Sequence, residues 1–352
     1  SRVGDGTNTK RTTVSYYGAS LFGLPEYVRV YDTDLSTVLK ELHTVYDLDA
    51  AYTSRRIIGL AGTVEVKGHD GSGLNLVSKV TYGYDAGNFD GAGQNISPVG
   101  HDGTNYGNGF VAGRGNLTSE TRWNVESGKE SNSAYAIGSS AKYNTAGAVV
   151  SQTTPWDGTS TRTVTIDYTD SFNSSGIAAT YAYPTKITDP RGAVTDITYN
   201  VLGSTTQIAY TPVSGLPDTP TVTFGYDDLG NRVSMDTAGV SEVAYAYDPL
   251  SRMTSETVNF DDLANNLTIG YTYGLTGLKS ITDPSGKEIE YAKDRAGRLT
   301  AVTGDAFGQN TTGTYASGIE YRAFGQVKQM DYNLSNGNSR IKLDYDNRLR
   351  VD

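Results

Sequence analysis

Cysteine is absent from this 352-residue sequence, and only three histidines and three methionines occur in it. A chain without cysteine has no disulfides, no thiol nucleophile and no cysteine–metal site. The histidines, His43, His69 and His101, lie outside H-E-x-x-H and G-x-S-x-G motifs. We therefore predict a non-enzymatic chain that needs no cofactor and has no catalytic, cofactor-binding or metal-binding residues.

Long apolar runs and basic clusters are missing too. No run approaches the roughly 18 apolar residues of a membrane-spanning helix, and no signal sequence opens the chain, so we expect no membrane insertion. The formal net charge is −10 with the acids scattered, which leaves no basic stripe for nucleic acid. Nucleic acid is therefore excluded as an expected partner. The chain begins and ends within strand-like sequence, so we expect it to be a piece of a longer protein.

Glycine and tyrosine are abundant, with 41 and 26 copies, which is typical of strands and turns. An aromatic residue recurs that is usually followed by Asp or Asn and, four places on, by glycine, as in YDDLGNRV. The aromatic position is filled by Tyr143, Tyr199, Tyr226, Tyr247 and Tyr321, by Lys293 once, and by Tyr345 in a shortened final copy. The glycine position is filled by Gly147, Gly203, Gly230, Gly297 and Gly325, and once by Ser251.

Turn chemistry explains the repeat. The acids Asp227, Asp248, Asp294 and Asp346 can hydrogen-bond the backbone two residues on, and glycine adopts a positive φ without a Cβ clash. The arginines that follow, Arg232, Arg252 and Arg298, are expected to pair with acids of adjacent turns. The tyrosines are interpreted as structural rows along the sheet; the alternative is an aromatic platform that stacks on sugar rings.

A second turn type is predicted between these copies, in DPRG (189–192), DPSG (283–286) and PWDG (155–158). Gly192 lies 11 residues before Gly203, and Gly286 lies 11 residues before Gly297. This spacing leaves room for one short strand between turns. The sequence therefore predicts an all-β fold of repeated hairpins that bury apolar surface against one another.

We predict a single continuous array over 1–352, in which three kinds of sequence follow one another. Residues 1–84 carry irregular repeats, 85–115 form a long Gly/Asn/Asp-rich loop, and 116–352 carry regular hairpins. The segment 34–47 fits either a short amphipathic helix or a pair of strands, and its surroundings favour β structure. In the loop, Asp85, Asn88, Asp90 and Asp102 suggest calcium, but their spacing does not match an EF-hand, so a solvated surface loop is the preferred interpretation.

The motif Y-D-x-x-G-R-L with D-P-x-G between copies resembles the YD repeat of bacterial Rhs proteins, toxin-complex shell components and teneurins. Segments such as GLPEYVRVYD (23–32) and YAYPTKITDPRGAVTDITYN (181–200) also resemble Rhs-repeat sequence. The resemblance covers nearly the whole chain. It implies a ribbon of stacked β-hairpins that spirals into a hollow, β-solenoid-like shell.

The resemblance implies a structural wall that encapsulates a C-terminal toxin or other cargo of the parent protein, at the cell surface or after secretion. Its expected partners are that cargo and further repeats of the same protein. The D-P-x-G-L closing segment of such shells is absent, so no cleavage residue is carried over. The alternatives are a cell-surface adhesion or carbohydrate-binding module, and an extracellular scaffold or filament.

Overall fold

Short segments rich in Thr, Val, Ile and Tyr form strands between tight turns, as β-branched and aromatic residues favour. The computed structural model describes all residues except 1, 5–8, 19–21, 88, 90, 92, 158–159, 173–176, 306–311, 335–336, 347 and 352. The described residues form two units, one of residues 1–203 and 210–219 and the other of residues 204–209 and 220–352. The single continuous array over 1–352 stays a prediction.

The first unit contains fourteen strands and three single-turn helices in its described part. The strands are β1 (Arg2–Gly4), β2 (Thr9–Tyr16), β3 (Pro25–Tyr31), β4 (Val38–Tyr46), β5 (Ala61–His69), β6 (Leu74–Tyr84), β7 (Leu117–Arg122), β8 (Ile137–Tyr143), β9 (Val149–Pro155), β10 (Thr161–Asp167), β11 (Ser171–Phe172), β12 (Ile177–Ala178), β13 (Lys186–Thr188) and β14 (Val194–Tyr199). The helices are α1 (Ala50–Thr53), α2 (Gly103–Tyr106) and the 3₁₀ turn η2 (Ser133–Tyr135). None of the helices in the described residues is long and apolar enough to cross a membrane.

The second unit is built from strands alone in its described part. They are β15 (Thr205–Thr211), which begins in this unit, β16 (Val222–Tyr226), β17 (Arg232–Thr237), β18 (Ser241–Tyr247), β19 (Met253–Phe260), β20 (Leu267–Gly274), β21 (Gly277–Thr282), β22 (Glu288–Lys293), β23 (Leu299–Asp305), β24 (Thr312–Tyr321), β25 (Val327–Leu334) and β26 (Gly337–Lys342).

Strands pair antiparallel with their neighbours in the chain. In the second unit β18 pairs with β17 and β19, and the β18–β19 register runs from Ser241 opposite Phe260 to Tyr247 opposite Met253. In the first unit the small β11–β12 hairpin is set aside from the meander, and β10 pairs directly with β13. The predicted all-β hairpin fold is confirmed. Residues 38–46 form the single strand β4, so β structure is right for the ambiguous segment and the expected pair of strands is wrong.

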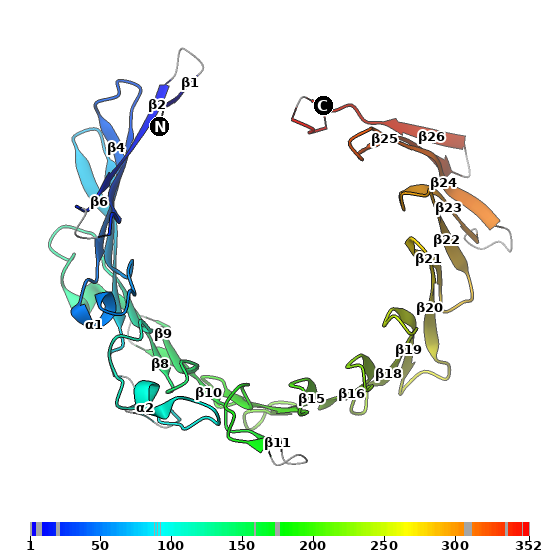
Figure 1. Ribbon diagram of the computed structural model, residues 1–352, viewed down its shortest axis with the longest axis horizontal. Coiled ribbons are helices and arrows are strands. Elements are labelled where there is room, and N and C mark those ends of the chain that lie inside the picture. Colours follow the sequence, from blue (N-terminus) through cyan, green and yellow to red (C-terminus); the bar gives the residue numbers. More distant parts are fainter. Residues whose placement is uncertain are drawn as a thin grey trace. The chain divides into compact units, whose positions relative to one another are not determined.

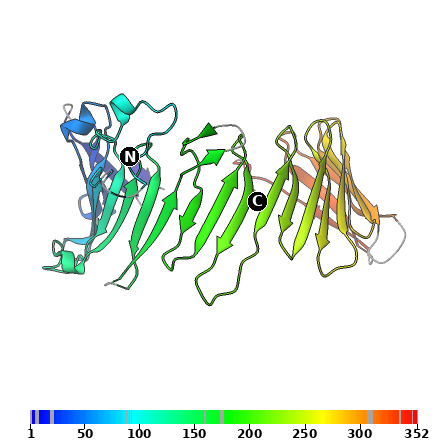
Figure 2. The same cartoon turned by 90° about the horizontal axis from the view of Figure 1, so that it is seen from below.

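In each unit, taken by itself, the main sheet is a single layer of strands (Figure 1), which run between two edges made of turns (Figure 2). Only four apolar side chains of the described residues are buried, namely Tyr52, Val150, Val243 and Ala316. The accessible surface is 21647 Å². Two compact globular domains with a combined mass of 37.7 kDa would have a total accessible surface of only about 17000 Å². Both faces of the layer are therefore substantially exposed.

Candidate functional site

The turn that opens with Tyr226 shows how the repeat works. The Asp227 carboxylate accepts hydrogen bonds from the backbone N–H groups of Leu229 at 3.0 Å and Asn231 at 2.8 Å. The N–H of Gly230 donates to the Asp227 carbonyl at 3.0 Å. Gly230 has a φ of 82°, a conformation that residues with a Cβ rarely adopt. The acid thus holds the loop closed, and the glycine allows the chain to reverse.

Other copies repeat this pattern. The side chains of Asn144, Asp248, Asp294 and Asp346 each accept N–H groups two and four residues on. The glycines have positive φ, as do the residues that replace glycine in two copies, Ser251 and Leu349. The structure places the repeat positions at these turns; whether they define a repeat in the parent protein stays a prediction.

The prediction of a second turn type is wrong for DPRG and DPSG. The Asp189 side chain accepts N–H groups from Arg191 at 2.8 Å and Ala193 at 2.9 Å, and Gly192 has a φ of 93°. Asp283 is bonded in the same way. Both are the Asp227 turn with proline after the acid, where its fixed φ suits the turn. PWDG ends at Gly158, which lies outside the described residues.

Turns of the two sequence types lie at opposite edges of the second unit. The tyrosine copies join β16 to β17, β18 to β19 and β24 to β25, and the lysine copy joins β22 to β23. The DPSG turn joins β21 to β22, so it lies at the other ends of the antiparallel strands. We call the edge formed by residues 227–231, 248–252, 275–276, 294–298 and 322–326 the tyrosine edge.

The repeat tyrosines link neighbouring strands through their hydroxyls. Tyr247 Oη donates to the carbonyl of Arg232, the first residue of β17, at 2.9 Å. Equivalent bonds run from Tyr226 to Thr205, from Tyr321 to Leu299, from Tyr345 to Val327, from Tyr143 to Leu117 and from Tyr199 to Pro184, at 2.8 to 2.9 Å. Burial raises the pKa of the Tyr247 hydroxyl, which keeps it a donor. The structural role predicted for these tyrosines has this geometric basis.

Lysine in the aromatic position keeps the same function. Lys293 Nζ donates to the carbonyl of Thr276 at 3.1 Å, just before β21 begins. A long side chain that ends in a donor is therefore the common requirement of the position, and an aromatic ring is not.

We expect Tyr247→Phe to destabilise the second unit by about 0.5–1.5 kcal/mol, because the Arg232 carbonyl loses its donor while the ring remains. Tyr271→Phe is the matched control, since the Tyr271 hydroxyl has no hydrogen-bond partner among the described residues. Urea unfolding of both variants measures the difference. Equal urea midpoints for the two variants would show that the hydrogen bond from the Tyr247 hydroxyl does not contribute to stability.

We expect Gly230→Val to destabilise by about 1–3 kcal/mol through strain at a positive φ. A Cβ at Gly230 meets nothing within 4 Å, so crowding does not contribute. Gly274→Val is the control, because its Cβ also enters open space and its φ is not positive. An unchanged melting temperature for Gly230→Val would contradict the conformational explanation.

Pairing with acids of adjacent turns was predicted for the arginines after the turns and is wrong: Arg252 and Arg298 pair with the acid of their own turn. Arg252 bonds to Asp248 at 2.6 Å and Arg298 to Asp294 at 2.8 Å. Each guanidinium also lies over a tyrosine near the next turn along this edge: Arg252 over Tyr273 at 4.6 Å and Arg298 over Tyr321 at 4.9 Å. Own-turn pairing is favoured because the two residues are held four apart by the turn. The guanidiniums therefore connect successive turns through the rings.

Arg232 differs, because it forms no ion pair within the described part of the chain. Its guanidinium lies 5.1 Å from the ring centroid of Tyr245 and 5.7 Å from that of Phe224. The residue four before it is Asp228, one place past the turn acid, so the own-turn geometry is not available to it.

The connection between β6 and β7 is not a fully solvated loop as expected. Asp85 is buried, and its carboxylate accepts backbone N–H groups from Arg114, Gly115 and Asn116 at 2.8, 3.0 and 2.9 Å. Gln94 is fully buried and donates to the Tyr143 carbonyl at 2.9 Å. Buried polar groups need such partners. The loop is thereby fastened to the adjacent β8–β9 turn.

No calcium site forms from the residues that the structure describes. Asn88 and Asp90 lie outside them, Asp85 accepts three backbone N–H groups, and Asp102 caps α2 through Thr104 and Asn105. No group of three acidic or histidine side chains suitable for a metal occurs in the described ranges.

An aromatic–arginine cluster forms where the same connection meets the segment after α1: Tyr106, Phe110 and Arg114 of the connection and Arg55 of that segment line a hollow of about 510 Å³. The guanidiniums of Arg55 and Arg114 lie 4.2 and 5.0 Å from the Phe110 ring centroid. Arg114 also donates to the carbonyls of Phe110 and Thr145, both at 2.7 Å, so its charge is committed to holding the loop. Tyr106 is half exposed.

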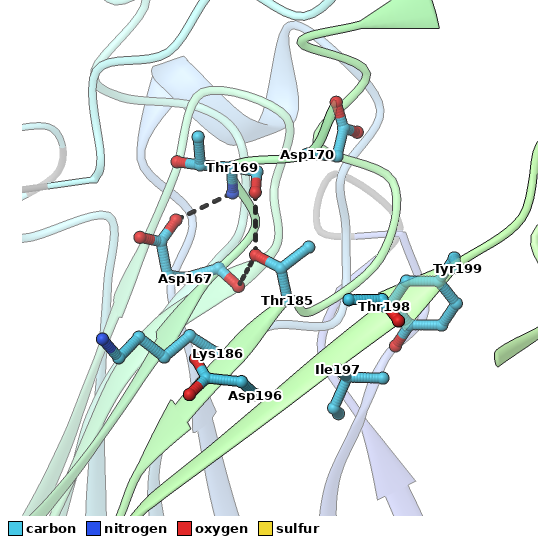
Figure 3. Close-up of a pocket in the computed structure, with 9 residues that line it drawn as sticks. All are labelled: Asp167, Thr169, Asp170, Thr185, Lys186, Asp196, Ile197, Thr198 and Tyr199. Atoms are coloured by element: carbon cyan, nitrogen blue, oxygen red, sulfur yellow. Dashed lines mark hydrogen bonds between the residues drawn. The ribbon is translucent and has the colours of Figure 1, made fainter. Parts of the chain in front are cut away.

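A second hollow of about 350 Å³ lies over β10, β13 and β14 (Figure 3). Asp167, Lys186 and Asp196 sit opposite one another in register across these strands. Asp170 above them is buried and accepts the N–H groups of Thr180 and Tyr181 at 2.9 and 2.8 Å. The lining contains no histidine.

The histidines make structural contacts. His43 stacks on Tyr27 with ring centroids 4.3 Å apart, His69 Nδ1 accepts the N–H of Gly71 at 2.9 Å, and His101 Nε2 lies 3.0 Å from the Tyr106 carbonyl.

Comparison with solved structures identifies the architecture. The chain superposes on TcdB2-TccC3 with a TM-score of 0.58 at 13% identity, over 98% of this chain. The chain shares the fold of TcdB2-TccC3. A TcdB2-TccC3 structure without the hypervariable C-terminal region gives a TM-score of 0.56 at 15% identity, again over 98% of this chain.

This chain spans 16% of the length of either TcdB2-TccC3 chain. No protein-family model and no curated protein matches it. The TcdB2-TccC3 likeness confirms, at the level of the fold, the resemblance found in the sequence.

Proposed function

We propose that this chain is a segment of the wall of an Rhs/YD-repeat shell that encloses a C-terminal toxin or other cargo of its parent protein. The observation that carries the proposal is the single layer of strands with both faces exposed, which is unusual for a chain of this mass. A layer of this kind separates two spaces. The TcdB2-TccC3 fold supports the same role. The segment is non-catalytic, its partners are cargo and further repeats, and the parent acts at the cell surface or after secretion.

Protease protection in the full-length parent tests enclosure. We expect the C-terminal region to survive a protease concentration that digests the same region expressed alone, and to become sensitive once the shell is denatured. Electron cryo-microscopy of the same sample should show density inside a cavity. Digestion of the C-terminal region at equal rates in both contexts would contradict the proposal.

A second candidate is a carbohydrate-binding adhesion module, favoured by the half-exposed Tyr106 beside Phe110 and Arg55. Aromatic faces with nearby hydrogen-bond donors suit sugar rings. A glycan array probed with the chain and with the Tyr106→Ala variant separates the two candidates. Glycan binding that is lost in the variant would support the adhesion module, and a chain that binds no glycan would contradict it.

A further inference from the structure

The aromatic–arginine hollow is locally positive, although the formal net charge of the chain is −10. The described residues that line it include Arg55 and Arg114 and no acidic side chain. Neither guanidinium forms an ion pair with a carboxylate in the described part of the chain. A concave site lined by charges of one sign concentrates ions of the other sign. The hollow therefore favours an anion.

The two arginines differ in the N–H groups that they leave available. Arg114 donates to four backbone carbonyls, so its role is to hold the loop. Arg55 donates through Nη1 to the carbonyl of Ala51 at 3.0 Å, and its Nε and Nη2 groups have no acceptor among the described residues. A guanidinium binds a carboxylate through two parallel N–H groups. Arg55 is therefore the residue that can bind the anion.

The Arg55 guanidinium is fixed in position, although the residue is exposed. It lies 4.2 Å from the ring centroid of Phe110. On its other contact side, a Cβ at Gly113 would lie only 2.5 Å from Nη1, so the glycine leaves the space that the guanidinium occupies. A group that is already held in place loses little conformational freedom when a ligand binds.

The rest of the lining indicates what carries the negative charge. Tyr106 is 52% exposed, and its ring lies edge to face with that of Phe110. An aromatic ring beside hydrogen-bond donors suits a sugar ring. Asn116 adds a buried side-chain N–H group that has no acceptor in the described residues. A hollow of about 510 Å³ is within the usual size of ligand pockets.

We propose that this hollow binds an acidic saccharide, in which the carboxylate of a uronic acid pairs with Nε and Nη2 of Arg55 and the sugar ring packs on Tyr106. Arg114 is a positioning residue, because it donates to the Tyr106 carbonyl at 2.5 Å. The proposal rests on the second candidate function and names the class of glycan. The net negative charge of the chain repels anions at long range, so binding depends on this local ion pair.

Ligand-observed NMR titration of the 352-residue chain with glucuronate tests the proposal, and glucose is the neutral counterpart with the same ring. We expect a Kd on the order of 1 mM for glucuronate, as for a ligand of this size. The Kd for glucose should be at least about tenfold higher, because glucose lacks the charge-assisted hydrogen bonds. Added salt should weaken the binding of glucuronate.

Arg55→Gln should raise the Kd for glucuronate to that for glucose, because the amide keeps a donor and loses the charge. Arg56→Gln is the matched control: Arg56 is exposed, the variant removes the same charge from the neighbouring position, and Arg56 does not line the hollow. Little change in Kd is expected for the control. Circular dichroism melts establish that both variants are folded.

Four results would overturn the proposal: no binding of glucuronate, equal Kd values for glucuronate and glucose, equal effects of the two variants, or binding of benzoate without binding of glucuronate. The glycan array decides the adhesion function separately. Neutral glycans bound by the chain and lost in Tyr106→Ala, with no preference for glucuronate, would keep the adhesion module and overturn the acidic ligand. Glucuronate binding that Arg55→Gln abolishes, in a chain that binds no array glycan, would do the reverse.

Discussion

Asp85→Ala is expected to destabilise the first unit by about 3–5 kcal/mol, because it removes a buried carboxylate that three backbone N–H groups share. Each of those donors is left without its acceptor in a part-buried site. Burial lowers the pKa of Arg114, and the negative charge of Asp85 acts to raise it. In the variant Arg114 therefore also loses a compensating charge. The 85–116 connection should therefore detach before the strands unfold.

Urea unfolding and hydrogen exchange at residues 114–116 measure these two effects. Asp228→Ala is the control, because Asp228 is exposed and its side chain accepts no hydrogen bond from any described residue; a change within about 0.5 kcal/mol is expected. Asp85→Ala could instead lower the free energy of unfolding no more than the control and leave hydrogen exchange at 114–116 unchanged. The hydrogen bonds to the Asp85 carboxylate would then not be a source of stability.

The turns could be predicted from sequence, because everything that makes them lies within five residues. Asp227 and Gly230 encode their own hydrogen bonds and backbone conformation, and recurrence of the pair indicated hairpins. The same locality explains the error over DPRG: proline suggested a different turn, although Asp189 and Gly192 sit at the same separation and form the same bonds.

Contacts between distant residues were not predictable. Asp85 meets donors 29–31 residues later, and Thr145 Oγ1 reaches the Gln94 carbonyl across 51 residues. The hydrogen bonds of the repeat tyrosines depend on which strands are neighbours, since Tyr247 at the end of β18 reaches the carbonyl of Arg232 on the paired strand β17. The acid-rich composition of 85–115 suggested solvent or calcium; its pairing partners could have been found only by knowing which strands are neighbours.

Acid should unfold this chain more readily than its sparse core alone would suggest. In the folded chain, hydrogen bonds lower the pKa of turn aspartates below the ordinary value near 3.8: the Asn231 side chain and turn N–H groups act on Asp227, the Arg252 side chain on Asp248, and the backbone N–H of Arg298 on Asp294. Because these folded-state pKa values are depressed, the stability they confer is present above the unfolded value and is lost as pH falls through the folded values. The window lies below about pH 4. We expect the melting temperature to fall between pH 5 and pH 2.5.

The triple variant D227N/D248N/D294N separates this linkage from general charge effects. Asparagine can accept the same turn N–H groups, as Asn144 does at 3.0 and 2.9 Å, but it does not titrate. The variant should therefore lose some stability at pH 7 and show a smaller fall in acid. D228N/D261N/D262N removes the same charge from exposed acids whose side chains accept no hydrogen bond in the described residues, so its acid fall should match that of the parent sequence. An equal reduction in both triples would assign the acid sensitivity to net charge, whereas a reduction confined to the turn triple assigns it to the repeated aspartate that closes each hairpin.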